Sequence, residues 1–168
     1  TVSDGNNGQV TDTFTITVTN TNDAPTITST AVTSAEEDDA YTYTVTAADV
    51  DAGDTITLSG TTVPSWLTFT ASTGVLTGTP SNSDVGSHAV VLTATDAAGA
   101  TAVDSFTIVV ANANDDPVVT STAVTSATED AAYTYTLTAT DADAGDTLTM
   151  SGTTVPSWLT FTASTGVL

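Results

Sequence analysis

The sequence predicts an all-β protein made of tandem Greek-key β-sandwiches, and three observations support this fold class. Apolar and polar residues alternate with period two over most of the 168 residues, as in half-buried strands. Threonine, a β-branched residue that suits pleated sheets, supplies 42 of the 168 residues, whereas long helix-favouring side chains are scarce. Turn signals separate the alternating segments, which is typical of a sandwich with about seven short strands in about 90 residues.

The alternation of apolar and polar residues predicts where each strand lies along the chain. A strand is expected over 13–19, where Phe14, Ile16 and Val18 alternate with threonines. The same pattern predicts strands over 41–47 and 133–139 and around 106–110. Shorter strands are expected over 26–32, 54–59, 66–70, 74–77 and 87–95. Residues 4–8 predict a hairpin turn, because Asn-Gly accepts the positive φ of tight turns, and 96–99 occupy the same place further along.

An internal repeat of 92 residues organises the chain. Residues 24–76 and 116–168 are identical at 43 of 53 positions. The same offset relates the acids and apolar residues of 4–23 to those of 96–115. We therefore expect the C-terminal strands of one repeat in 1–23, a complete sandwich in 24–115 and the N-terminal part of a third repeat in 116–168. On this interpretation the chain is a fragment of a longer repeat array.

Composition excludes several classes of function. The chain has 20 acidic residues, no lysine and no arginine, so its formal net charge is −20. Nucleic acids and anionic membrane surfaces are excluded as partners, because both are bound through Lys and Arg. The absence of cysteine excludes thiol catalysis, disulfides and Cys-ligated metals. The sequence has no apolar run of 18 residues, so we expect no membrane insertion of this segment.

The acids avoid the strand centres and gather in turns and linkers. They lie in the linkers around 20–23 and 112–116, in an early loop at 36–39, in D-x-D turns at 49–51 and 141–143, and in a late hairpin at Asp96. Clusters of carboxylate and amide oxygens without nitrogen or sulfur ligands suit a hard cation, and Ca²⁺ tolerates the irregular geometry of loops better than Mg²⁺ does. Asp, Asn and Gly also form ordinary turns, so a metal-free interpretation stays open at this point.

The motifs in order along the chain resemble cadherin-type repeats. Residues 138–143 read like the A-x-D-x-D segment of that family, 94–99 like its A-x-D-x-x-G turn, and 112–117 like its D-x-N-D-N-x-P linker. The stretch from Pro64 to Gly86 is most similar to the dystroglycan-type cadherin-like, or Ig, modules of large bacterial surface proteins. Two departures are visible: the linkers begin with Asn instead of Asp, and the acidic L-D-R-E motif is absent. They imply fewer ions at a junction or weaker binding.

This resemblance implies Ca²⁺ between consecutive repeats. Carried over by position, the ligands at the first junction would be Asn20, Asn22, Asp23, Asp49, Asp51 and Asp96. At the second junction they would be Glu36 or Glu37, then Asn112, Asn114, Asp115, Asp141 and Asp143. The resemblance further implies an extracellular or cell-surface location, with neighbouring repeats as partners and cell-surface glycans or proteins as possible adhesion targets.

We therefore expect a calcium-stiffened structural and adhesion module of a bacterial surface or secreted protein. Two alternatives remain: a carbohydrate-binding accessory module that uses Trp66, and a metal-free spacer. No enzyme is expected, because His88 has no partnering nucleophile motif and the paired acids lie in turns instead of a cleft. Trp66 is expected to be a core anchor within its Pro-Ser-Trp-Leu-Thr-Phe segment.

Overall fold

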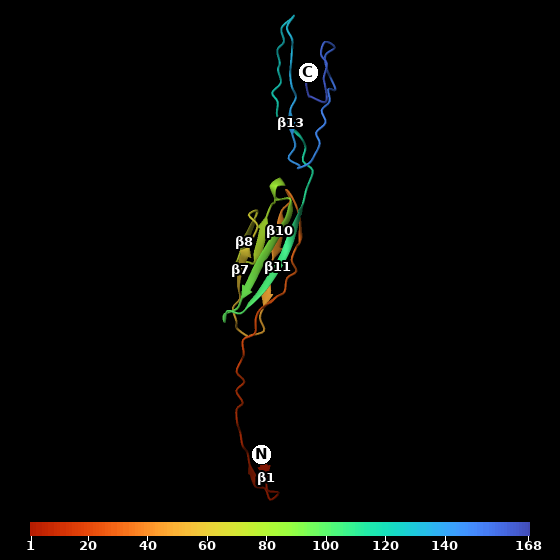
Figure 1. The fold of residues 1–168 in the computed structure, drawn as a ribbon. Helices are drawn as coiled ribbons and strands as arrows, with labels where there is room; N and C mark the ends of the chain where they lie inside the picture. The colour runs from red at the N-terminus through yellow and green to blue at the C-terminus, as the bar shows by residue number, and fades with distance from the viewer.

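The computed structural model describes residues 1–168 and is an elongated all-β structure (Figure 1). A sandwich lies at its centre, an extended segment leads from it to the N-terminus, and a looser strand assembly lies at the C-terminal end (Figure 1). None of its segments is a helix of the length and apolar character needed to cross a bilayer. The predicted all-β class is confirmed.

Most strands of the structure are short. They are β1 (Val2–Ser3), β2 (Gln9–Val10), β3 (Thr26–Ile27), β4 (Ser34–Glu36), β5 (Tyr41–Thr44), β6 (Ala47–Ala48), β7 (Thr57–Thr62), β8 (Leu67–Thr70), β9 (Val75–Gly78), β10 (Gly86–Thr95), β11 (Thr101–Ala111), β12 (Val118–Val119) and β13 (Ala139–Thr140). A short 3-10 turn, η1 (Asn82–Asp84), lies between β9 and β10.

Two sheets form the central sandwich. One has the strand order β4-β11-β10-β7 and the other β5-β9-β8. The antiparallel β10–β11 hairpin is the longest ladder, and β4 runs parallel to β11 with Ala35 opposite Val110. The chain then crosses from β4 in one sheet to β5 in the other. This crossing places residues 37–40 beside the end of β11, where the chain leaves the sandwich toward residues 116–168 (Figure 1).

The core lies between these sheets and follows the period-two pattern. Tyr41, Tyr43 and Val45 are buried, while the threonines between them are exposed. They pack with apolar side chains of β8 to β11, namely Leu67, Leu76, Val90, Leu92, Ile108 and Val110. Burial of each large apolar side chain contributes about 1.5–3 kcal/mol. This core is what holds the loops at the ends of the sandwich in fixed positions.

A polar network is tied to the same core. The Tyr43 hydroxyl donates to Oδ2 of Asp104 at 2.6 Å and lies 2.8 Å from Oγ of Ser29. Burial, together with the hydrogen bond to Asp104, raises the pKa of Tyr43 to about 12. A buried hydroxyl without such partners would cost about 1–3 kcal/mol, so the network offsets the burial of Tyr43.

Residues 116–168 repeat the first half of the sandwich. The pair β12–β13 reproduces β3–β6, with Val118 opposite Thr140 as Thr26 is opposite Ala48. The chain has no counterpart of β10 and β11 over this second copy, because its residues correspond to 24–76. Trp158 is consequently 64 % exposed, whereas its counterpart Trp66 is half-buried.

The predicted strand over 13–19 is wrong. This segment has no ladder, and Phe14, Ile16 and Val18 are exposed by 78, 75 and 88 %. The equivalent segment of β11 forms a strand because β10 and β4 pair with its two edges. A strand needs such a neighbour for its main-chain hydrogen bonds, and residues 13–19 have none within this chain.

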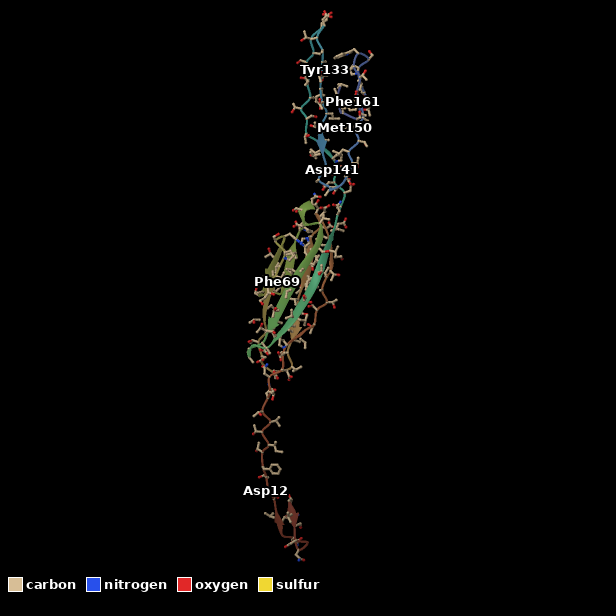
Figure 2. The ribbon with its side chains drawn as sticks, in the orientation of Figure 1. Asp12, Phe69, Tyr133, Asp141, Met150 and Phe161 are labelled. Carbon is tan, nitrogen blue, oxygen red and sulfur yellow. The ribbon has the colours of Figure 1, made fainter.

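Other predicted strands are shorter or displaced. Of the segment 26–32 only β3 (Thr26–Ile27) forms a strand, which pairs with β6; the next strand, β4, begins at Ser34 and pairs with β11. The strand predicted over 54–59 begins at Thr57, since the Asp54 N–H is held in a turn by the Asp51 carbonyl at 3.2 Å. Of the predicted strand 133–139, which starts at Tyr133 (Figure 2), only Ala139 lies in a strand, β13, and Thr136 forms an isolated bridge to Val167.

The hairpin predicted at 4–8 is present. β1 and β2 flank it, the Asp4 N–H donates to the Gly8 carbonyl at 3.1 Å, and Asn7 has φ +69°. The turn at 96–99 has the same form, with the Asp96 N–H donating to the Ala100 carbonyl at 3.0 Å. Main-chain N–H donors of Asn6 and Gly8 lower the pKa of Asp4, so this carboxylate acts as the cap of its own turn.

Candidate metal centres

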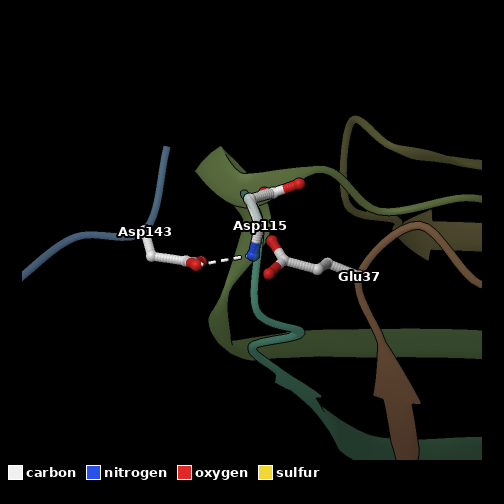
Figure 3. A group of neighbouring side chains, drawn as sticks. All are labelled: Glu37, Asp115 and Asp143. Atoms are coloured by element: carbon white, nitrogen blue, oxygen red, sulfur yellow. Dashed lines mark hydrogen bonds between the residues drawn. The ribbon is translucent and has the colours of Figure 1, made fainter. Parts of the chain in front are cut away.

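Three carboxylates from different parts of the chain meet at the second linker. Glu37 comes from the crossing between β4 and β5, Asp115 from the linker, and Asp143 from the turn after β13 (Figure 3). One oxygen of each lies within 4.8 Å of the others. Glu37 is 2 % and Asp143 is 6 % exposed, so these charges are held largely away from water.

Local structure explains why Glu37 points to the linker. The Glu37 N–H donates to the Ala111 carbonyl at 3.0 Å, which continues the pairing of β4 with β11 by one residue. Asp38 then takes φ +62°, and this left-handed residue turns the chain sharply toward β5. Oε1 of Glu37 accepts from the Ala113 N–H at 2.7 Å, whereas Oε2 is buried and has no hydrogen-bond partner.

The turn after β13 supplies the opposite side of this group. The Asp143 N–H donates to Oδ1 of Asp141 at 3.0 Å, so the D-x-D turn is closed by its own first carboxylate. Oδ2 of Asp143 accepts from the Asp115 N–H at 2.7 Å, the contact drawn in Figure 3. Asp141, Asp143 and Asp146 form a second group within the same distance limit, so Asp143 belongs to both.

The first linker adjoins another carboxylate group, at the other end of the sandwich. Asp49, Asp54 and Asp96 each place one oxygen within 4.8 Å of the others. Oδ2 of Asp49 and Oδ2 of Asp54 are buried without a hydrogen-bond partner. Burial raises the pKa of Asp54, and the charges of Asp49, Asp96 and Asp51 add to this effect.

Asp96 shows the opposite electrostatic response. Its side chain is 5 % exposed, and a hydrogen bond from the Asn22 amide is the main reason that its pKa is lowered. Asn22 Nδ2 lies 2.9 Å from Oδ2 of Asp96, and the Ala100 N–H lies 2.7 Å from Oδ1. Asp96 therefore loses its proton more readily than Asp54, although the two carboxyl groups are neighbours.

The structure brings some of the predicted ligands together in carboxylate groups and leaves others outside them. Glu37 lies in the group at the second linker, while the alternative Glu36 is exposed at the end of β4 and lies outside it. Asp49, Asp96, Asp115, Asp141 and Asp143 all lie in carboxylate groups. Asp51 adjoins the first group because its N–H donates to Oδ1 of Asp49 at 2.9 Å, and the Asp23 N–H in turn donates to Oδ2 of Asp51 at 2.7 Å.

The linker asparagines lie at both junctions with their amide nitrogens as donors. Asn20 and Asn112 donate to the second Asp of the D-x-D turns, Asn22 to Asp96, and Asn114 to the carbonyl of Asp115. The sequence prediction expected their oxygens as ligands. Their amide oxygens remain available as acceptors on the same side chains.

Three further residues join the candidate sites. Asp54 and Asp146 follow the D-x-D turns at the same spacing and complete two of the groups. Asn82, in η1, donates to Oδ2 of Asp115 at 2.7 Å, and its own Oδ1 is buried without a partner. The recurrence of Asp54 as Asp146 was a usable sequence signal, whereas nothing in the sequence marks Asn82 as a neighbour of the linker.

The two residues that suggested other chemistry belong to the packing of the sandwich. Trp66 contacts the rings of Tyr41 and His88 edgewise, with centroid distances of 5.8 Å in both cases. The ring Nε2 of His88 lies 2.6 Å from the Asp84 carbonyl oxygen. Asp84 has a lowered pKa because it accepts from the main chain and side chain of Ser81. These contacts hold η1 in place beside the second linker.

The donor chemistry fits a calcium ion. The groups contain oxygen ligands only, they come from loops, and they include buried carboxylate oxygens that lack partners. Such oxygens are costly to bury unless a cation or donor meets them. Glu37, Asp115, Asp143 and Asp141 would hold the ion at the second junction, and Asp49, Asp54 and Asp96 would hold it at the first.

Comparison with solved structures finds partly similar chains. Among solved structures, a protocadherin gammaB7 fragment of domains EC3–6 is 19 % identical over 86 % of this chain and 42 % of its own, with a TM-score of 0.46. The SrpA adhesin of Streptococcus sanguinis is 17 % identical over 58 % of this chain and 63 % of its own, with a TM-score of 0.41. An endo-fucoidan hydrolase of glycoside hydrolase family 107 is 28 % identical over 54 % of this chain, with a TM-score of 0.46, and the chain spans only 14 % of that enzyme.

The sequence itself matches a family of domains. No curated protein matches the chain. The model of the family described as Putative Ig domain, He_PIG, matches residues 24–111 and again 116–168. These two matches cover most of the 168 residues, and they confirm the predicted Ig-like character of the repeats. The chain belongs to the He_PIG family of Ig domains.

Proposed function

We propose that this chain is a calcium-binding structural and adhesion module, in which Ca²⁺ at the inter-repeat junctions ties one repeat to the next. The observation that carries the proposal is the group of Glu37, Asp115 and Asp143, which unites the central sandwich, the linker and the following residues. The buried, unpartnered Oε2 of Glu37 lies within this group. A chain without Lys or Arg has no side-chain cation to meet these charges.

The chain's own residues account for the mechanical consequence. Three carboxylates within 4.8 Å of each other repel when ionised, and this repulsion favours separation of the central sandwich from residues 116–168. A bound Ca²⁺ would supply the positive charge that offsets this repulsion. Glu37 is fixed by β4 and Asp143 by its D-x-D turn, so a cation held by both carboxylates would connect the central sandwich to residues 116–168.

The setting that suits this function is extracellular. Calcium at millimolar concentration stabilises a protein that binds it only when folded, by about 2.7 kcal/mol at a hundredfold excess over Kd. We therefore place the module in a bacterial surface or secreted protein, with neighbouring repeats as its first partners and surface glycans or proteins as adhesion targets. The domain limits 1–23, 24–115 and 116–168 belong to this proposal, and the module has no catalytic role in it.

Calcium titration tests the proposal. Isothermal calorimetry of the 168-residue chain is expected to show binding to Ca²⁺, with a weaker response to Mg²⁺ because of its stricter geometry. The melting temperature is expected to rise in calcium relative to EDTA, while KCl of equal ionic strength gives a smaller change. Absence of binding heat together with equal melting temperatures would favour the metal-free spacer instead.

The carbohydrate-binding alternative receives no support from Trp66. Its indole is half-buried and makes T-shaped contacts with the rings of Tyr41 and His88, so it contributes to the packing of the sandwich. Glycan binding that is lost in Trp66→Ala and kept in Trp66→Phe, with both variants folded, would revive this alternative.

A further inference from the structure

Four asparagine side chains each donate to a different aspartate at the junctions. The amide nitrogen distances to the accepting carboxylate oxygens are 2.7 Å for Asn20 to Asp51, 2.9 Å for Asn22 to Asp96, 2.7 Å for Asn82 to Asp115 and 2.9 Å for Asn112 to Asp143. Each bond joins a linker to a sandwich element or turn that is distant in sequence.

Main-chain donors complete the contact at two of these aspartates. While Asn20 binds Oδ1 of Asp51, the Asp23 N–H binds Oδ2 at 2.7 Å. The second junction repeats this arrangement, because Asn112 binds Oδ1 of Asp143 and the Asp115 N–H binds Oδ2 at 2.7 Å. Both oxygens of each carboxylate thus accept from one linker. Two donors with a fixed spacing set the orientation of the carboxylate as well as its distance.

We propose that these amide–carboxylate bonds form a cation-independent lock, which holds each linker against the repeat that follows it. The asparagines are then positioning residues: they orient Asp51 and Asp143 through neutral donors. The lock concerns the same junctions as the proposed calcium sites, but its bonds need no ion.

The chemistry of asparagine explains its place at the start of each linker. A carboxylate partner is stabilised by an N–H donor, and hydrogen bonds to charged groups are stronger than those between neutral groups. An aspartate at position 20 or 112 would face another aspartate and repel it. Asn therefore closes the contact by itself, whereas Asp in this place would close it only with a cation between the two carboxylates.

Asn82 extends the lock to the preceding side of the second junction. It lies in η1, which is packed through His88 and Asp84 against the sandwich. Its bond to Asp115 attaches the linker to the central sandwich, while Asn112 attaches the linker to the turn after β13. The linker is consequently held on both sides by neutral amides.

A distance measurement across the second junction tests the lock. The chain has no cysteine, so Thr107→Cys on β11 and Thr149→Cys, both exposed, give a single pair of fluorophore sites. Time-resolved energy transfer in excess EDTA then reports the fraction of molecules with an open junction. Asn112→Asp is the test variant, and Asn114→Asp is its matched control, since it adds the same charge to the same linker but removes no bond to a carboxylate.

The lock predicts a closed junction for the unsubstituted chain in EDTA. Asn112→Asp is expected to raise the ratio of open to closed molecules about tenfold or more, the usual effect of losing one charge-assisted hydrogen bond. Asn114→Asp is expected to stay closed, and Asn112→Ala to open more than Asn114→Ala, which separates the lost donor from the added charge. A junction that is already open in the unsubstituted chain, or equal opening in the two Asp variants, would overturn the lock.

Calcium addition in the same experiment separates the two proposals. Closure of Asn112→Asp by calcium supports both the lock and the calcium site. A junction that is closed in EDTA while calorimetry shows no calcium binding supports the lock and contradicts the proposed function. Calcium binding by a chain whose junction is open in EDTA supports the proposed function and contradicts the lock.

Discussion

Replacing Glu37 by Gln separates the stability of the ion-free junction from its capacity to bind calcium. Glu37 has one oxygen within 4.8 Å of oxygens of Asp115 and Asp143. At a separation of 4.8 Å, two unit charges repel by about 3.5 kcal/mol at an effective dielectric constant of about 20, and by about 1 kcal/mol in water. Gln keeps the acceptor for the Ala113 N–H and removes this repulsion, so the ion-free chain is expected to become more stable.

The expected gain can be read as a melting temperature. For a chain of this size about 1 kcal/mol corresponds to roughly 2–4 °C, so Glu37→Gln is expected to melt roughly 2–14 °C higher in EDTA. The same change removes a charged ligand, and calcium affinity at this junction is expected to fall about tenfold or more. The variant therefore gains stability in EDTA and loses most of the further rise that calcium gives.

Scanning calorimetry in EDTA and in calcium measures both effects. Glu36→Gln is the control, because Glu36 is adjacent in sequence and has the same charge but is exposed outside the group. It is expected to leave both melting temperatures nearly unchanged. The reasoning is refuted if Glu37→Gln lowers the melting temperature in EDTA, or if the two variants respond to calcium alike.

Three further changes test the electrostatics and the backbone. Asp54→Asn is expected to raise the stability of the folded chain in EDTA at neutral pH. Because the folded-state pKa of Asp54 is raised, the stability that its protonated form contributes is present below pH 3.8 and is lost as pH rises through the higher folded-state pKa. Thermal melts from pH 3 upward should therefore show a smaller loss of stability in the variant. Tyr43→Phe is expected to lower the free energy of unfolding in urea by about 1–2 kcal/mol. Tyr135→Phe should cost less, because the Tyr135 hydroxyl contacts only a serine. The stability that depends on Tyr43 is also expected to fall as pH rises from 10 to about 12. Gly74→Ala is expected to prevent a native melt, because φ is +71° and a Cβ there would overlap the Val45 carbonyl oxygen.

The fold of the central sandwich was largely predictable, because the period-two pattern reports which side chains face inward. Tyr41, Tyr43 and Val45 show it clearly, since all three are buried and their threonine neighbours are not. The prediction over 13–19 failed for a reason that local sequence cannot reveal. Phe14 and its neighbours have the pattern of β11, but a ladder also requires partner strands, and only long-range pairing supplies them.

The candidate site was predictable in its acids and less so in its geometry. The choice between Glu36 and Glu37 was left open, although the repeat favours Glu37, which recurs as Glu129 while Glu36 becomes Thr128. Asn82 was missed because it reaches Asp115 from a turn 33 residues earlier. The direction in which an asparagine amide points is a property of its partners, so the donor role of the linker asparagines required the structure.

The distribution of charge now explains why a chain with a net charge of −20 can form a defined joint. Two kinds of partner are considered for the carboxylates at the junctions: amide donors from the linkers, whose bonds involve no ion, and a cation. Amide donors from the linkers neutralise no charge but fix Asp51 and Asp143 at any calcium concentration. The buried Oε2 of Glu37 has no such donor, so we expect its energy to depend on a cation. Under the two proposals together, the joint would be positioned by hydrogen bonds and strengthened by calcium, and replacing its asparagines by aspartates would transfer the positioning to the ion as well.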